Sequence, residues 1–280
     1  GLGHNPLEQR DEHPLLGARQ APDESTWIQR LSVATQPSLA DHRVGETPVL
    51  AAAAQVEMVL AAAITSTSDA VVEINDLEIL TPLVLDASVG KLTRLTLADQ
   101  GRVQLMVRDL DPSAAWQPHL NARLAPGCQG SLLHSAPPLM PASEAHSNGE
   151  ACPGNAGYLD DKAWLDSDTH LALARAMGLD YRGEYRSLGR IWRQDDEAIG
   201  EFLANDDAAC WWLPPGLLDG ALQLCLPLMN NDRAPLTMGY LPVRLSRMQF
   251  DRNAGRPTHA RAVITRRSPH SFTADLWLYR

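Results

Sequence analysis

Runs of basic residues are missing from this chain of 280 residues, which has 24 Lys and Arg against 34 Asp and Glu and a formal net charge of −10. Proteins that bind nucleic acid or anionic membranes usually carry a clustered basic surface. The composition therefore argues against both partners. The hydrophobic fraction of 44% is typical of a folded protein with one large domain or two ordinary ones.

Motifs for metals and nucleotides are also missing. The four cysteines lack C-x-x-C spacing and any neighbouring histidine cluster, and stand apart at Cys128, Cys152, Cys210 and Cys225. This spacing disfavours a zinc site and a disulfide framework, and favours free thiols in the cytoplasm. No G-x-G-x-x-G, Walker or G-x-S-x-G sequence occurs, so neither a nucleotide cofactor nor serine-hydrolase chemistry is supported.

The first residues have no charged segment leading into an apolar run, so we expect no export signal and a cytoplasmic location. The chain begins Gly-Leu-Gly-His without methionine, and we expect it to be a piece of a longer protein.

Two apolar segments dominate what is present. Thr47-Pro48 is a favourable helix start and precedes Val49–Ile64, in which only Gln55 and Glu57 are polar. A helix without a polar face is buried nearly all round, and this one is marginal in length for a membrane span. Leu213–Met229 repeats the pattern, with a proline entry and an apolar helix.

Alternating apolar and polar residues predict the strands around these helices. In the first half they are Trp27–Val33, Ala70–Ile79, Leu83–Leu85, Lys91–Ala98 and Gln100–Asp109, with a hairpin turn at Ala98–Gly101. In the second half they are Tyr185–Trp192, Ala198–Leu203, Leu245–Phe250, Thr258–Thr265 and Phe272–Tyr279, after a helix at Asp168–Met177 that stops at Gly178.

A connection rich in Pro, Gly, Ser, Ala and His separates the halves at Pro126–Gly157. We predict an N-terminal subdomain at 13–136, a linker at 137–157 and a C-terminal subdomain at 158–280. Each half has one buried helix and an antiparallel sheet. The predicted fold is therefore α+β, a double hot-dog in which each of two antiparallel sheets wraps round a long apolar helix.

One candidate for acid–base chemistry lies on or beside each apolar helix. Asp219 lies inside the second helix, and Gln223 follows four residues later on the same face. His42 precedes the first helix. A neutral imidazole suits proton abstraction, and a buried carboxyl with a raised pKa suits proton donation. The alternatives are an exposed Asp219 and a surface His42 bonded to Asp41.

The remaining histidines show no ligand spacing, and we interpret them as surface or packing residues: His13, His119, His134, His146, His170, His259 and His270. Trp211 and Trp212 precede the second helix and are interpreted as core or tunnel wall.

Several motifs taken together resemble the dehydratase domains of modular polyketide synthases, over almost the whole chain. The matching segments are His13-Pro-Leu-Leu-Gly17, Leu39-Ala-Asp-His42, Tyr158-Leu-Asp160, Trp192-Arg-Gln-Asp-Asp-Glu197, Leu218-Asp219-Gly-Ala-Leu-Gln223 and Tyr240-Leu-Pro-Val243.

The resemblance implies a double hot-dog that removes water from a β-hydroxyacyl chain, held as a thioester on the phosphopantetheine of an acyl carrier protein. It implies that His42 removes the α-proton, Asp219 protonates the leaving hydroxyl and Gln223 orients Asp219, without metal or cofactor. Neighbouring synthase domains are implied as partners, and dimerisation is common in the family. Backbone N–H groups at a helix N-terminus near Gly45 would stabilise the enolate.

Departures from the family pattern fall on the pocket walls, whose implied positions here are Gly45, Glu46, Ala51, Tyr181, Leu241 and Pro242. Glu46 and Ala51 replace a glycine and a proline, and Pro214-Pro215 replaces His-Pro. Three alternatives to simple dehydration stay open: pyran synthase-type ring closure by oxa-Michael addition to an enoyl thioester, an inactive scaffold, and a module that only binds the carrier protein.

Overall fold

A computed structural model describes residues 13–21, 24–85, 89–125, 164–204, 210–229, 241–268 and 271–280. The predicted linker at 137–157 and the motif residues Tyr158-Leu-Asp160 and Tyr240 lie outside these ranges. The division into two subdomains therefore stays a prediction. No helix within the described ranges is both long and apolar enough to cross a membrane.

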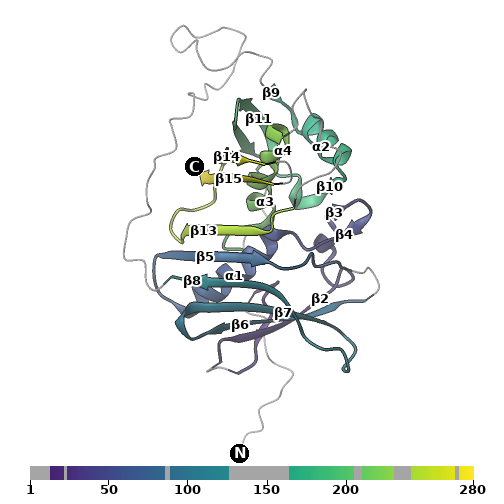
Figure 1. Ribbon diagram of the computed structural model, residues 1–280, viewed down its shortest axis with the longest axis vertical. Helices are drawn as coiled ribbons and strands as arrows, with labels where there is room; N and C mark the ends of the chain where they lie inside the picture. Colours follow the sequence, from purple (N-terminus) through teal and green to yellow (C-terminus); the bar gives the residue numbers. More distant parts are fainter. Residues whose placement is uncertain are drawn as a thin grey trace, which may run out of the picture.

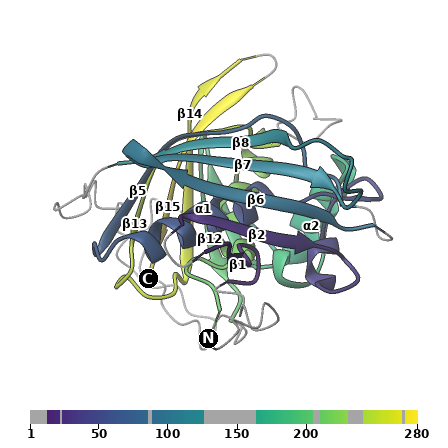
Figure 2. The same ribbon diagram turned by 90° about the horizontal axis from the view of Figure 1, so that it is seen from below.

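Helix α1 (Ala52–Ser66) packs against a large antiparallel sheet in the lower part of Figure 1. The strand order is β1-β2-β6-β7-β8-β5-β13. The strands are β1 (Ala18–Arg19), β2 (Thr26–Leu31), β5 (Val71–Ile79), β6 (Lys91–Ala98), β7 (Arg102–Asp109), β8 (Gln117–Leu124) and β13 (Arg244–Asp251). Figure 2 shows β2, β6, β7 and β8 running across α1.

Helix α3 (Pro215–Gln223) packs against a second antiparallel sheet of order β15-β14-β12-β11-β9. Its strands are β9 (Trp164–Leu165), β11 (Leu188–Gln194), β12 (Glu197–Phe202), β14 (His259–Arg267) and β15 (Phe272–Tyr279), and α4 (Cys225–Met229) follows α3. Each half therefore has the expected helix and antiparallel sheet.

Strand β13 joins the two halves. It belongs to the second half of the chain, yet it pairs with β5 of the first half along its whole length, from Arg244 opposite Glu78 to Asp251 opposite Val71. β13 and β5 lie side by side near the middle of Figure 1. The large sheet thus contains strands from both halves.

A third, small sheet contributes to the functional site. It contains β3 (His42–Val44), β4 (Thr47–Pro48) and β10 (Leu179–Tyr181), in the order β10-β3-β4. Helix α2 (Ser167–Ala176) leads into β10, and the short helix η4 (Gly183–Tyr185) follows it. Again strands from the two halves pair, because β10 lies antiparallel to β3.

The first apolar helix is buried nearly all round, as predicted: every residue from Ala53 to Ile64 is buried. It starts at Ala52 and not at Val49. The predicted cap is wrong, because Thr47 and Pro48 form β4 and the N-cap is Ala51, which makes no side-chain capping bond.

The second apolar segment is two short helices and not one, since α3 ends at Gln223 and α4 begins at Cys225. Pro227 explains the break: it has no N–H to bond to the carbonyl four residues earlier, which belongs to Gln223, and its ring crowds that carbonyl. The break leaves Asp219 and Gln223 on consecutive turns of α3.

Most predicted strands and the helix at Asp168–Met177 are found within a few residues of their expected bounds. The hairpin turn joins β6 to β7 as predicted, with Gln100 and Gly101 at positive φ. The strand predicted at Leu83–Leu85 is wrong, because only a bridge between Val49 and Val84 forms there. Strand β8 is not predicted by the sequence, since Pro118 interrupts its alternating pattern.

Candidate active site

His42 lies on β3 opposite Tyr181 of β10, and only 5% of its surface is exposed. Its Nδ1 lies 3.0 Å from the carbonyl oxygen of Val49. A carbonyl can only accept, so Nδ1 carries the hydrogen and donates it, and the lone pair of the neutral ring is on Nε2. The alternative of a surface histidine bonded to Asp41 is excluded by this burial and this partner.

Asp219 lies on α3 and is 4% exposed, which excludes the alternative of an exposed carboxylate. Its Oδ1 is 3.8 Å from Nε2 of His42, which is close contact but beyond a hydrogen bond. The structure thus brings together the two residues that the sequence singled out in opposite halves of the chain. Their reactive atoms face each other across a gap.

Gln223 touches Asp219 as its position one turn later predicts: its Nε2 donates to Oδ2 of Asp219 at 2.8 Å. The same Nε2 donates to the carbonyl oxygen of Tyr185 at 2.9 Å, which fixes which end of the amide is the nitrogen. Because Oδ2 accepts this bond, a proton on Asp219 belongs on Oδ1, the oxygen that faces His42.

The surroundings of Asp219 shift its equilibrium toward the protonated acid. Burial raises the pKa of Asp219 above the ordinary value for an aspartate, and the neighbouring His42 and the Gln223 hydrogen bond act in the opposite direction. A carboxyl with a raised pKa can hold a proton near neutral pH and donate it.

Two buried tyrosines flank the imidazole. The ring centroids of Tyr181 and Tyr185 lie 5.5 and 5.4 Å from that of His42. Burial raises the pKa of both phenols well above 10, so both stay protonated, and the charge of Asp219 adds to this. Tyr181 is expected at the pocket wall, whereas Tyr185 is predicted as the start of a strand and is not among the expected site residues.

The other expected wall residues differ in burial and lie on different elements. Gly45 and Glu46 form the exposed tip of the β3–β4 hairpin, and Ala51 is buried at the start of α1. Leu241 and Pro242 lie just before β13; Leu241 is half-buried and Pro242 is exposed. Their role in substrate binding stays a prediction.

The backbone N–H of Gly45 itself is engaged, and Gly45 does not lie at a helix N-terminus. The backbone N–H of Gly45 donates to the carbonyl of Gly178 at 2.8 Å, and the helix begins only at Ala52. The free N–H groups of a helix are those of its first turn, so donors for an enolate would come from the residues that follow Ala51.

Sequence reasoning missed the role of Glu57. It is 1% exposed on α1, and its carboxylate accepts the backbone N–H of Trp212 at 2.8 Å and of Leu213 at 3.0 Å, just before α3. Nε2 of His13 lies 3.1 Å from the same carboxylate, so His13 is a buried polar partner and not a surface residue. A signal for this role exists, since Glu57 is the only acid in the first apolar helix.

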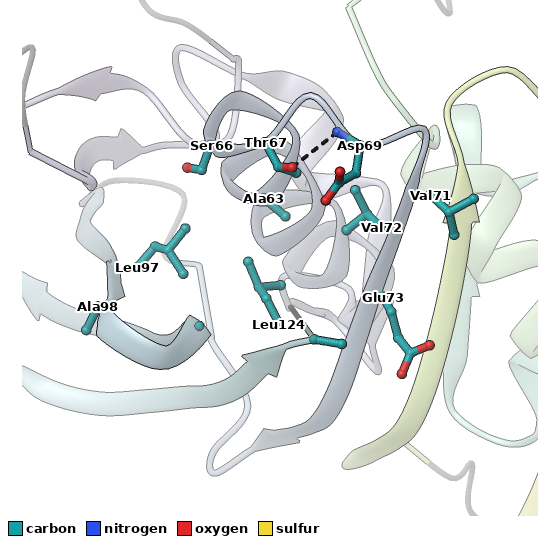
Figure 3. Close-up of a pocket in the computed structure, with 12 residues that line it drawn as sticks. Ala63, Ser66, Thr67, Asp69, Val71, Val72, Glu73, Leu97, Ala98 and Leu124 are labelled. Atoms are coloured by element: carbon teal, nitrogen blue, oxygen red, sulfur yellow. Dashed lines mark hydrogen bonds between the residues drawn. The ribbon is translucent and has the colours of Figure 1, made fainter. Parts of the chain in front are cut away.

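A pocket of about 280 Å³ lies at the other end of α1, lined among others by Ala63, Thr67, Asp69 and Leu124 (Figure 3). A helix of 15 residues is about 22 Å long, so this pocket is remote from His42. We therefore assign the candidate active site to the His42–Asp219 pair.

Family models match both halves of the chain. The model described as polyketide synthase dehydratase domain matches residues 13–109, and the model described as polyketide synthase dehydratase N-terminal domain matches residues 165–280. Together they span well over half of the chain.

Curated relatives are parts of large polyketide synthases. The chain is 30% identical over 280 residues to the spectinabilin polyketide synthase system protein NorA of Streptomyces orinoci, covering 94% of this chain and 13% of the relative. It is 29% identical over 231 residues to the pikromycin polyketide synthase component PikAII of Streptomyces venezuelae, covering 76% of this chain and 6% of the relative. The chain therefore spans a small fraction of these proteins.

Solved structures support the fold. The dehydratase domain of RzxB from Pseudomonas fluorescens is similar with a TM-score of 0.70 and 22% identity, covering 96% of this chain and 94% of that one. The dehydratase domain from the CurJ module of curacin polyketide synthase has a TM-score of 0.74 and 17% identity, covering 96% and 91%. The predicted α+β double hot-dog is confirmed, and with both halves matched the chain belongs to the dehydratase-domain family of polyketide synthases, a family of hydro-lyases.

Proposed function

We propose that this domain removes water from a β-hydroxyacyl thioester carried by an acyl carrier protein, with His42 as the base and Asp219 as the acid. One observation carries the proposal: Nε2 of His42 faces Oδ1 of Asp219 at 3.8 Å. The carbonyl of Val49 fixes the tautomer of His42, and the carbonyl of Tyr185 fixes the orientation of the Gln223 amide that bonds Asp219. Nε2 of His42 therefore has the lone pair, and Oδ1 of Asp219 is the oxygen that can carry the proton.

The substrate chemistry fits this pair. The α-hydrogen and the β-hydroxyl are on adjacent carbons, so a base and an acid must act a few ångströms apart. Nε2 of His42 takes the α-proton, the electrons form the α,β double bond, and Oδ1–H of Asp219 protonates the departing hydroxyl. Water leaves, and the proton on His42 returns to Asp219, which restores the starting state.

Abstraction of the α-proton also needs stabilisation of the enolate that develops on the thioester oxygen. The first turn of α1 supplies free backbone N–H groups. Val49, which lies two residues before the N-cap Ala51, holds His42 by two hydrogen bonds, one to its ring and one to its carbonyl. The N-terminus of α1 is therefore the proposed oxyanion site.

The proposed partners are an acyl carrier protein with its phosphopantetheine-linked chain and the neighbouring domains of a polyketide synthase. We infer the second from the curated relatives, which are named as parts of such synthases. Gly45, Glu46, Ala51, Tyr181, Leu241 and Pro242 stay the proposed substrate contacts, and a homodimer stays the proposed assembly.

The test is mass spectrometry of the purified domain with a synthetic β-hydroxyacyl thioester. We expect loss of one water, and we expect this loss to be abolished in His42→Ala and in Asp219→Asn, because each variant removes one of the two proton carriers. The variant His119→Leu changes a buried histidine on β8 and serves as a control that should retain activity. Turnover that survives in both active-site variants would contradict the assignment.

A second thioester separates dehydration from ring closure. It has an α,β-unsaturated chain with a distal hydroxyl, and a pyran-forming enzyme would convert it to an isomer of equal mass and different retention time. The changed wall positions Glu46 and Ala51 are the reason to include this substrate. If neither thioester reacts, the inactive-scaffold and carrier-binding alternatives gain support.

A further inference from the structure

His170 lies on α2 with 1% of its surface exposed, and its Nε2 is 3.1 Å from Oε1 of Gln223. The sequence predicts only a surface or packing residue at this position. The contact instead links α2 to the Asp219–Gln223 pair.

The carbonyl oxygen of Tyr185 accepts from Nε2 of Gln223, so the other end of that amide is an acceptor. Nε2 of His170 must therefore donate its hydrogen to Oε1 of Gln223. Burial lowers the pKa of His170, although the Gln223 bond acts in the opposite direction, so the ring is neutral near pH 7. A neutral ring with its hydrogen on Nε2 has its lone pair on Nδ1.

Nδ1 of His170 is buried and has no hydrogen-bond partner among the described residues. A buried polar atom without a partner lowers stability, so an apolar residue would fill this place more favourably. Within the described part of the chain, the one hydrogen bond of this ring is to Gln223. This points to a role for His170 at the active site and not in packing alone.

We propose that His170 is a positioning residue for the acid: it holds the Gln223 amide so that Oδ2 of Asp219 is always an acceptor and the transferable proton is on Oδ1. The proposal rests on the proposed dehydratase activity. Without the His170 donor, Oε1 of Gln223 is buried without its partner, and the amide keeps only its two N–H bonds, to Tyr185 and to Asp219. A less tightly held amide bonds Oδ2 of Asp219 less well, so the charged form of the carboxylate loses stabilisation.

The main variant is His170→Leu, which removes the donor and fills the space. We expect kcat for dehydration to fall about tenfold, with KM changed much less, because losing one buried hydrogen bond is worth roughly one order of magnitude. His170→Gln keeps an N–H donor at a similar reach and should recover most of the rate. His119→Leu is the matched control, since it removes another buried histidine, which lies on β8 and bonds Thr81.

The pH dependence of kcat separates positioning from a loss of packing. Asp219 is faced by His42 on β3, Tyr181 on β10, and Tyr185 and Gln223, and these groups stay the same in each variant. The limb that reports the Asp219 proton should move to higher pH in His170→Leu, because the less tightly held Gln223 amide stabilises the charged form less well. A packing defect would lower the whole profile without moving that limb.

Either an unchanged rate and profile in His170→Leu, or an equal loss in His170→Leu and His170→Gln with an unmoved limb, would overturn the proposal. If the wild-type domain does not dehydrate the thioester, the proposed function fails while His170 remains testable by NMR. Hydrogen exchange of the Gln223 side-chain amide should then be slow in the wild type and faster in His170→Leu. Equal exchange in the two proteins would overturn the proposal.

Discussion

The carboxylate of Glu57 accepts the backbone N–H of Leu213 at 3.0 Å, although the two residues are 156 positions apart. Glu57 lies on α1, and Leu213 precedes α3, the helix that carries Asp219. One buried side chain of the first half thereby fixes where the acid-bearing helix of the second half begins. The position of Asp219 thus depends on a residue outside the catalytic pair.

Glu57→Gln should lower the free energy of unfolding by about 1 to 3 kcal/mol, because the amide NH₂ must face one of the backbone donors at Trp212 and Leu213 and leaves it unpaired. Urea unfolding followed by circular dichroism checks this. Glu78→Gln, on an exposed position of β5, is the matched control and should change stability little. Equal stability of the two variants would show that the Glu57 contacts contribute nothing.

Glu184→Gln should flatten the pH dependence of stability. Burial, with a contribution from Asp41, raises the pKa of Glu184 from 4.5 to about 7. The folded chain therefore holds this proton more tightly than the unfolded chain does. The stability from this group is fully present below about pH 4.5 and is lost as the pH rises through about 7.

The wild type should lose on the order of 2 kcal/mol more than Glu184→Gln between about pH 5 and pH 8. Urea unfolding at both pH values measures this difference. Burial also raises the pKa of Asp41, but Asp41 is present in both proteins. Parallel stability curves for the two proteins would disprove the assignment to Glu184.

Gly216→Ala should displace the start of α3. A Cβ at this position would overlap the backbone carbonyl of Glu184, which cannot move aside as a flexible side chain can. We expect a loss of about 1 to 3 kcal/mol in the free energy of unfolding and a lower dehydration rate. In Gly189→Ala, the control, the nearest atom is a methyl group of Leu203 at 3.1 Å, so a smaller effect is expected in thermal unfolding and turnover.

The hydrogen on the neutral ring of His42 should be on Nδ1 and not on Nε2, because the carbonyl of Val49 accepts it. Long-range proton–nitrogen NMR at about pH 8, where an ordinary imidazole is neutral, distinguishes the two forms. The spectrum of His42→Asn identifies the signals. A hydrogen found on Nε2 would leave no lone pair facing Asp219 and would contradict the proposed base.

Local pattern in the sequence was enough for much of the fold. The apolar residues between Val49 and Ile64 predict a helix buried on all sides, and alternation predicts most strands, because both patterns depend on neighbours within one or two turns. The spacing of Asp219 and Gln223 similarly predicts their contact. Local pattern gave a wrong prediction where strand pairing competes with it. Thr47 and Pro48 suit the start of a helix, but they form β4, which pairs with β3.

Only the tertiary structure decided which distant groups meet. Sequence alone could propose His42 and Asp219, but their facing across 3.8 Å depends on the pairing of β3 with β10 and on the packing of α3. The roles of His170 and Glu57 depend on contacts between segments far apart in the chain, and a periodic sequence pattern does not reveal such contacts. The sequence determined the elements and the chemical candidates, and the packing of the two halves selected the ones that form a site.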